Sequence, residues 1–118
     1  MAVVTTVGVL KSIVTACKRS ALVQSYTVRD MDEDILSVRV YLQEEAFGAE
    51  AFIEAFYNVA TQRTSFALIV EGRRVYGKDN ARKGWHVHPF SDPNAHHPCQ
   101  PTDFPAFLSE VEAYIRSS

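Results

Sequence analysis

Proline placement constrains the fold of this chain more than any other feature of its sequence. All five prolines lie between residues 89 and 105, and four of them interrupt the stretch from Pro89 to Pro101. Because proline lacks an amide hydrogen and fixes its own backbone angle, regular structure is not expected in that stretch. A loop of this length inside a compact domain is usually functional or else disordered. The sequence therefore predicts regular elements before residue 89 and a final element after residue 101.

The first regular element is predicted to be a helix. Between residues 7 and 17 the apolar side chains recur at helical spacing, and polar or basic residues occupy the other face. The expected apolar stripe consists of Val7, Leu10, Ile13, Val14 and Cys17.

After this helix the apolar pattern changes to a period of two, which indicates strands. Leu22 to Arg29 and Ile35 to Gln43 are expected to form a hairpin, joined by the acidic turn Met31 to Asp34. Glu50 to Val59 fits a helix by its alanine and glutamate content, but it fits a strand by its alternation. We choose the strand for this segment.

A second hairpin is predicted further along the chain. Thr64 to Val70 reads as a strand, and Glu71-Gly72 supplies a tight turn before Arg73 to Tyr76. This turn brings the basic residues that follow to an edge or an end of the sheet.

The last element is predicted to be a helix that begins after the proline-rich loop. Thr102 or Asp103 can cap it, and Pro105 fits its first turn. Its apolar stripe is expected to consist of Phe104, Phe107, Leu108, Val111 and Ile115.

These elements predict one α+β domain that covers residues 1–118. It has an N-terminal helix, an antiparallel meander of about five strands, and a C-terminal helix packed on one face. A chain of 118 residues with 47% hydrophobic residues can bury a single core of this kind.

The sequence also indicates where the protein is expected to reside. No apolar run approaches the ~20 residues of a membrane span, and the first residues lack the pattern of a secretory signal. We expect a cytoplasmic protein that binds no membrane. Cys17 and Cys99 match no metal or redox spacing, so they are expected to be free thiols.

Charge is small overall but unevenly distributed. A net charge of -2 argues against nucleic-acid binding over the whole surface, because such domains are usually strongly basic. Five of the 12 lysines and arginines nevertheless lie close together, namely Arg73, Arg74, Lys78, Arg82 and Lys83. This stretch is the cationic pole of a mildly acidic chain.

Two histidines that follow the cationic stretch are the best candidates for chemistry. His86 and His88 lie on the same side of an extended backbone, because side chains alternate along a strand. As an acid and base pair they would suit RNA cleavage without a metal: one takes the 2′-hydroxyl proton and the other protonates the leaving oxygen. Asp79 is expected to orient the site. Substrate contacts are expected from Arg73, Lys78 and Arg82 to phosphate and from Trp85 to a base.

Two other interpretations of these residues stay open. The histidines can be exposed or capping side chains, and Asp79-Asn80 can form a turn whose side chains bond to the backbone. A metal site could instead recruit His86, His88, His96, His97, Cys99 and Asp79. Their spacing matches no zinc signature, and His96-His97 reads more simply as a solvated loop segment. We therefore expect no metal and no cofactor.

The order of these features resembles the TumE family of small toxin-antitoxin-system proteins. The likeness spans nearly the whole chain, and its more specific parts are Asp79-Asn80-Ala81 and the histidines His86 and His88. It implies a prokaryotic toxin that acts as a ribonuclease or otherwise on RNA. Asp79, Asn80, His86 and His88 are the site residues that the resemblance implies, with Asn80 as a substrate contact.

The resemblance also implies a partner, a small antitoxin that carries a helix-turn-helix DNA-binding domain. A homodimer is a further candidate assembly. The alternative from a different class is a non-catalytic binding or assembly module, whose edge strand and proline- and histidine-rich loop contact a partner protein.

Overall fold

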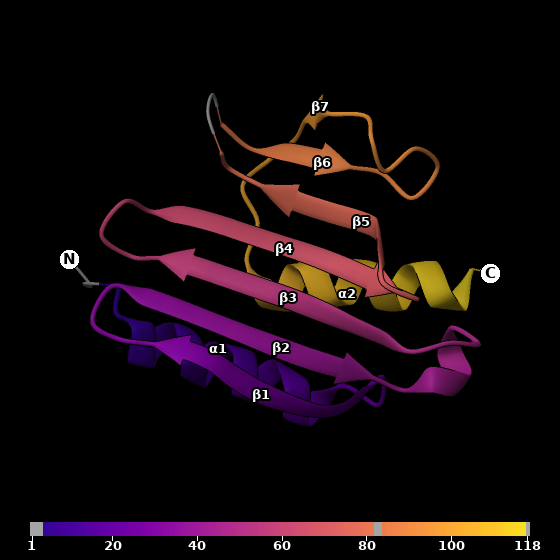
Figure 1. Cartoon of the computed structure of the whole chain (residues 1–118), viewed down its shortest axis with the longest axis horizontal. Coiled ribbons are helices and arrows are strands. Elements are labelled where there is room, and N and C mark those ends of the chain that lie inside the picture. Colours follow the sequence, from indigo (N-terminus) through magenta and orange to yellow (C-terminus); the bar gives the residue numbers. More distant parts are fainter. Residues whose placement is uncertain (1–3, 82–83, 118) are drawn as a thin grey trace.

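A computed structural model describes residues 4–81 and 84–117 of the chain (Figure 1). The elements in chain order are α1 (Thr6–Arg19), β1 (Val23–Met31), β2 (Ile35–Leu42), η1 (Glu44–Ala46), β3 (Ala51–Asn58), β4 (Arg63–Val70), β5 (Arg73–Asp79), β6 (His86–His88), β7 (His97–Pro98) and α2 (Phe104–Arg116). The seven strands in these described ranges form one antiparallel sheet in sequence order. The predicted α+β class is confirmed. None of the described helices is long and apolar enough to cross a membrane.

The expected five-strand meander is extended by two short strands, β6 and β7. The two-residue strand β7 lies inside the proline-rich loop, where no regular structure was expected. Its residues pair with β6, so that His97 is opposite Val87 and Pro98 is opposite His86. A proline can occupy such a position because an edge strand has one row of backbone groups without a neighbour.

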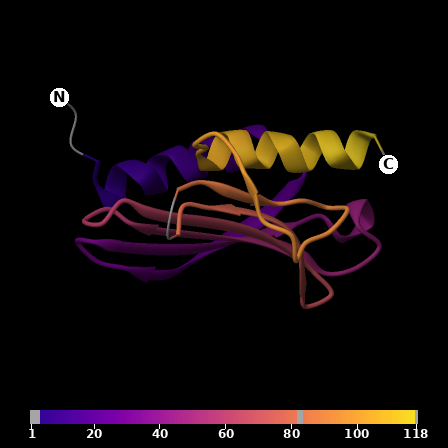
Figure 2. The same ribbon diagram turned by 90° about the horizontal axis from the view of Figure 1, so that it is seen from above.

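Both helices cover the same face of the sheet, as Figure 2 shows. Every second side chain of the central strands is buried beneath them, because side chains alternate along a strand. The buried positions are Leu36, Val38, Val40, Leu42, Ala51, Ile53, Ala55, Phe66 and Leu68. The opposite face carries the intervening side chains, and none of the described helices lies on it, so we call it the open face.

The segment from Glu50 to Val59, which fits both a helix and a strand by sequence, is confirmed as a strand. It forms β3, which lies between β2 and β4 and is hydrogen-bonded to both. On the open face of the sheet, Glu54 of β3 forms an ion pair with Arg39, whose guanidinium also lies 4.2 Å from the ring centre of Phe52. Tertiary pairing therefore outweighs the helix propensity of the alanines and glutamates.

The tight hairpin at Glu71-Gly72 is also confirmed. Both residues have positive φ, 51° for Glu71 and 76° for Gly72. Two successive residues of this kind give a turn whose twist matches that of the flanking strands, and β4 and β5 leave it as an antiparallel pair.

The C-terminal helix is the element whose prediction fits most closely. Asp103 caps α2 by accepting a hydrogen bond from the Ala106 amide, and Pro105 lies in its first turn. The buried residues Phe104, Phe107, Leu108 and Val111 form the expected stripe, whereas Ile115 at its end is only partly buried.

The N-terminal helix is where predicted, and its buried face differs from the expected one in the first turn. Ile13 and Cys17 are buried, and burial raises the pKa of the Cys17 thiol to about 11. Val7 is 52% exposed, so its place in the apolar stripe was wrong. Thr6 is buried instead, because its hydroxyl donates a hydrogen bond to the Asp32 carbonyl in the turn between β1 and β2. This bond fixes the rotation of the helix on the sheet.

The two faces of α1 predict a contrast between two matched truncations. Ile13→Ala should lower the free energy of unfolding by about 2–5 kcal/mol, because Ile13 is fully buried and the change leaves a cavity. Val7→Ala should change it by less than about 0.5 kcal/mol. Urea unfolding followed by circular dichroism measures both values. Equal losses for the two variants would contradict the observed rotation of α1.

Candidate functional site

Titratable side chains gather on the open face of the sheet, at the end where β5 finishes and β6 begins. The orientation follows from β5, in which Tyr76 and Lys78 both donate hydrogen bonds to Glu110 of α2. These two side chains therefore face the helices. Because neighbours alternate along a strand, Gly77 and Asp79 face the open side.

Strand register brings residues from three strands into one row. Asp79 is directly opposite Ser65 of β4 on one side and opposite His86 of β6 on the other. Neighbouring strands lie about 4.8 Å apart, so the row spans roughly 10 Å. His88 is opposite Gly77 in the next row, which places both histidines of β6 on the open face with Asp79.

His88 is held by Asp79 beneath the surface. Its Nε2 lies 3.1 Å from the Asp79 Oδ2, and its side chain is only 4% exposed. Its Nδ1 is buried and forms no hydrogen bond with the described residues. A neutral ring that donates from Nε2 to the carboxylate keeps Nδ1 as its basic nitrogen. This pairing of imidazole and carboxylate is the arrangement that fixes histidine tautomers in catalytic sites.

Gly77, which is opposite His88, has little space for a side chain. A Cβ at this position would lie 3.0 Å from the backbone oxygen of Phe66 and 3.4 Å from the Cδ of Arg74. A larger residue here would therefore displace Arg74 or strain the pairing of β4 with β5.

A third imidazole joins the site from the proline-rich loop. The His96 ring centre lies 4.4 Å from that of His88 and 6.3 Å from that of His86, edge to face in both cases. The pairing of β7 with β6 and a hydrogen bond from the Cys99 amide to the Trp85 carbonyl fold the loop back over β6. His96 is exposed and His86 is half-buried, so both are more accessible than His88.

Lys78 has a different role from the one expected. Its Nζ lies 2.8 Å from the Glu110 Oε2 on the helix side of β5, and its side chain is 13% exposed. Tyr76 donates to the other oxygen of Glu110 at 2.6 Å, and burial followed by this hydrogen bond raises the pKa of the tyrosine. These groups attach α2 to β5, and they point away from the imidazoles.

Asn80 is engaged in internal hydrogen bonds at both ends of its amide. Its Oδ1 accepts from the Thr64 amide at 2.7 Å, and its Nδ2 donates to the Gln62 carbonyl at 2.7 Å. The side chain therefore ties the end of β5 to the turn before β4. Asp79 also accepts a hydrogen bond from the Ala81 amide, in the manner of a turn.

The remaining predicted contacts do not converge on the imidazoles. Arg73 and Asp79 are at opposite ends of β5, about 20 Å apart at the usual rise of a strand. Trp85 is partly buried against the core. Arg82 and Lys83 lie outside the described residues, so their expected role is not addressed by the structure.

Arg63 and Ser65 were not identified from the sequence. They share a face of β4 with each other, and Ser65 is opposite Asp79, so both lie on the open face beside the histidines. A shallow hollow of about 720 Å³ adjoins this end of the sheet and is lined by Phe56, Asn58, Thr61, Gln62, Arg63, Asn80 and Ala81. Alternation along β4 alone could not place Ser65 beside Asp79, because the register between β4 and β5 decides which residues become neighbours.

Cys99 is not suited to act as a nucleophile here. Burial raises the pKa of its thiol, and the charge of Lys78 opposes this effect only in part. The thiol form therefore predominates at neutral pH, whereas the thiolate is the reactive form.

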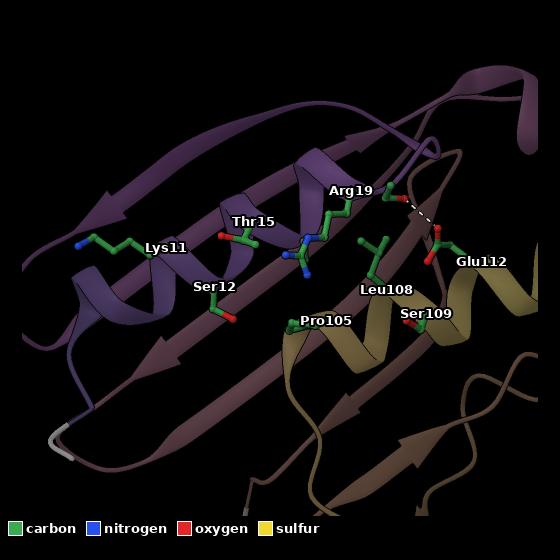
Figure 3. Close-up of a pocket in the computed structure, with 10 residues that line it drawn as sticks. Lys11, Ser12, Thr15, Arg19, Pro105, Leu108, Ser109 and Glu112 are labelled. Carbon is green, nitrogen blue, oxygen red and sulfur yellow. Dashed lines mark hydrogen bonds between the residues drawn. The ribbon is translucent and has the colours of Figure 1, made fainter.

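A separate groove of about 500 Å³ lies between the two helices (Figure 3). Lys11 and Arg19 of α1 line it together with Glu112 of α2, whose carboxylate accepts a hydrogen bond from the Ser20 hydroxyl. The groove is on the helix side of the sheet, so it is not continuous with the imidazole site.

Two further observations bear on the identity of the site. Within residues 4–81 and 84–117, no group of three or more His, Cys, Asp or Glu side chains is arranged to hold a metal ion. Comparison with protein-family models, curated proteins and solved structures finds no match to this chain. The case for a function therefore depends on the geometry of the site and on the resemblance seen in the sequence.

The two bonds of Asn80 predict a structural role for its side chain. Asn80→Ala should lower the free energy of unfolding by about 1–3 kcal/mol, because the buried backbone amide of Thr64 loses its acceptor. Asn94→Ala, at an exposed position of the loop, is the control and should change it by less than about 0.5 kcal/mol. Chemical unfolding checks both. Unchanged stability together with weaker RNA binding would instead support the substrate contact.

Proposed function

We propose that this protein is the toxin component of a prokaryotic toxin-antitoxin system and that it cleaves RNA without a metal. The observation that carries the proposal is the cluster of His86, His88 and His96 around Asp79 on the open face of the sheet. Acid–base cleavage of RNA needs two groups that exchange protons near neutral pH, and histidine is the side chain that does so. The resemblance to the TumE family supports the same reading.

Exposure divides the roles among the three imidazoles. His86 and His96 are accessible, and we assign them as the base and the acid that touch the substrate. His88 was expected to be one of this pair, but its burial makes it a positioning residue that Asp79 orients and that contacts the His96 ring. A buried imidazole such as that of His88 can set the orientation of a neighbouring imidazole without touching the RNA.

In the proposed reaction, His86 accepts the 2′-hydroxyl proton while that oxygen forms a bond to the adjacent phosphorus. The bond between phosphorus and the 5′ oxygen breaks, and protonated His96 gives its proton to that oxygen. The products are a 2′,3′-cyclic phosphate and a 5′-hydroxyl. Arg63 lies on this face at the same end of the sheet, and it replaces Lys78 as the group that stabilises charge on the phosphorane.

The proposed biological partner is an antitoxin with a helix-turn-helix domain, as the resemblance implies. An antitoxin that covers the open face at β5 and β6 would exclude RNA from the imidazoles. The location proposed for the pair is the cytoplasm, where the RNA is.

A non-catalytic binding module is the second candidate, and specific contacts favour it. Asn80, Lys78 and His88 all bond to other parts of the chain. Side chains occupied in this way contribute to stability whether or not the surface performs chemistry. In this alternative the loop at residues 89–101 and strand β6 contact a partner protein.

Paired measurements separate the two functions. The tag-free protein should cleave single-stranded RNA in EDTA to a 2′,3′-cyclic phosphate, and its induced expression should arrest bacterial growth. His86→Ala and His96→Ala should each lower the cleavage rate about a hundredfold or more, as loss of a general acid or base does. His97→Ala is the matched control, because His97 is an exposed neighbour in the same loop, and it should keep full activity.

The enzymatic proposal fails if the unmodified chain neither arrests growth nor cleaves RNA. It fails equally if His97→Ala loses as much activity as His96→Ala while all variants remain folded. Growth arrest that persists with His86→Ala and with His96→Ala would point to the binding module.

A further inference from the structure

The two edges of the sheet are built very differently. One edge is β7, which has two residues and contains a proline. The other is β1, which has nine residues and pairs only with β2 in the described part of the chain. A long edge strand presents unpaired backbone groups to other chains, whereas a short strand with proline does not. Docking through an added strand is therefore open to β1 alone among the described edges.

β1 also exposes apolar side chains that an ordinary edge would bury or avoid. Tyr26, Val28 and Met31 are all exposed. They are opposite Val40, Val38 and Leu36 of β2, whose side chains point to the helix side, so the three apolar groups share that side. They form a stripe along the rim of the sheet.

The pairing of β1 with β2 is regular at the centre of the strand. Its register shifts only further out, once between Val23 and Ser25 and once between Val28 and Asp30. A second β1 that runs antiparallel across a two-fold axis at Thr27 therefore meets regular backbone from Tyr26 to Val28. Bulges usually discourage edge pairing, but here they leave these three central positions unaffected.

The same axis pairs apolar residues with apolar residues. Tyr26 of one copy is opposite Val28 of the other, and Thr27 is opposite Thr27. Val23 is opposite Met31 at the ends of the strand. Aromatic with β-branched pairs and threonine pairs are among the cross-strand contacts that stabilise antiparallel sheets.

Charge complementarity extends the match beyond the strand. The turn after β1 carries the exposed acids Asp32, Glu33 and Asp34, while the end of α1 just before β1 carries the exposed bases Lys18 and Arg19. In the antiparallel arrangement, the acidic turn of each copy lies beside the basic helix end of the other. Opposite charges therefore meet at both ends of the interface.

We propose that β1 pairs with β1 of a second copy about a two-fold axis at Thr27, which joins the two sheets into one. The interface is isologous, as in most homodimers, so its contacts occur twice. It uses the edge of the sheet that is remote from the imidazoles and does not depend on the function proposed for them.

Reciprocal charge substitutions test the register. The unmodified protein should be a dimer by light scattering or sedimentation at micromolar concentration. Tyr26→Lys and Val28→Glu should each weaken the dimer about tenfold or more, because each puts a charge against an apolar side chain twice. A mixture of the two variants should form a heterodimer, in which the introduced lysine and glutamate are opposite each other.

Cysteine cross-linking tests the axis directly. In a Cys99→Ser background, Thr27→Cys should form an intermolecular disulfide on mild oxidation, because residues on the axis face each other. Ser25→Cys is the matched control on the same side of the strand. It should not cross-link, because its two copies are offset by about 13 Å along the strands, well beyond disulfide reach.

Each outcome decides the proposal. A monomer at all concentrations up to about 100 μM overturns it, because a specific interface is expected to be at least this strong. A dimer in which Ser25→Cys cross-links as fast as Thr27→Cys, or in which Val28→Glu has no effect while the variant stays folded, overturns the register and the axis. RNA cleavage and growth arrest are separate readouts, so a failure here is distinguishable from a failure of the histidine site.

Discussion

A column of aromatic rings holds the second half of this protein together. Phe107 of α2 lies between Phe66 of β4 and Tyr76 of β5, with ring centres 5.3 Å and 5.4 Å away. The column continues through Phe90, stacked 4.2 Å from Tyr76, to Tyr114, stacked 3.6 Å from Phe90. It joins the core to the loop that follows β6, so the position of the short strands depends on α2 rather than on strand pairing alone.

Strand β5 is where stability and the candidate chemistry meet. Its helix-facing residues, Tyr76 and Lys78, bond to Glu110. Its open-facing residues are Gly77, which is opposite His88, and Asp79, which bonds to the His88 imidazole. The two sets alternate along one backbone, so neither can shift without the other. A site on such a strand is held more rigidly than one on a free loop. His96 is the exception, because it comes from the loop and owes its place to the two-residue pairing of β7.

Local periodicity was enough to find the elements, but not their neighbours. The stripe of α2 from Phe104 to Val111 was readable because a cap and a proline fix where the helix begins. Val7 was misplaced because the rotation of α1 depends on the bond between Thr6 and a distant carbonyl. Alternation placed His86 and His88 on the same side of β6. The same rule puts the adjacent Lys78 and Asp79 on opposite sides of β5, which is why the expected role of Lys78 beside the histidines was wrong. The contacts of His88 with Asp79 and His96 required register and loop path, which no local pattern encodes.

The β1 edge, where the proposed dimer forms, lies far from the imidazole cluster at β6. Five strand spacings separate β1 from β6, about 24 Å at the usual spacing, so a dimer joined through β1 would hold its two imidazole clusters roughly 50 Å apart. At that distance, charges on one site are screened from the other, since the Debye length is about 8 Å at physiological ionic strength. Each open face would then meet its RNA or protein partner independently. Substitutions in β1 would change the number of sites per particle while leaving the chemistry of each site intact.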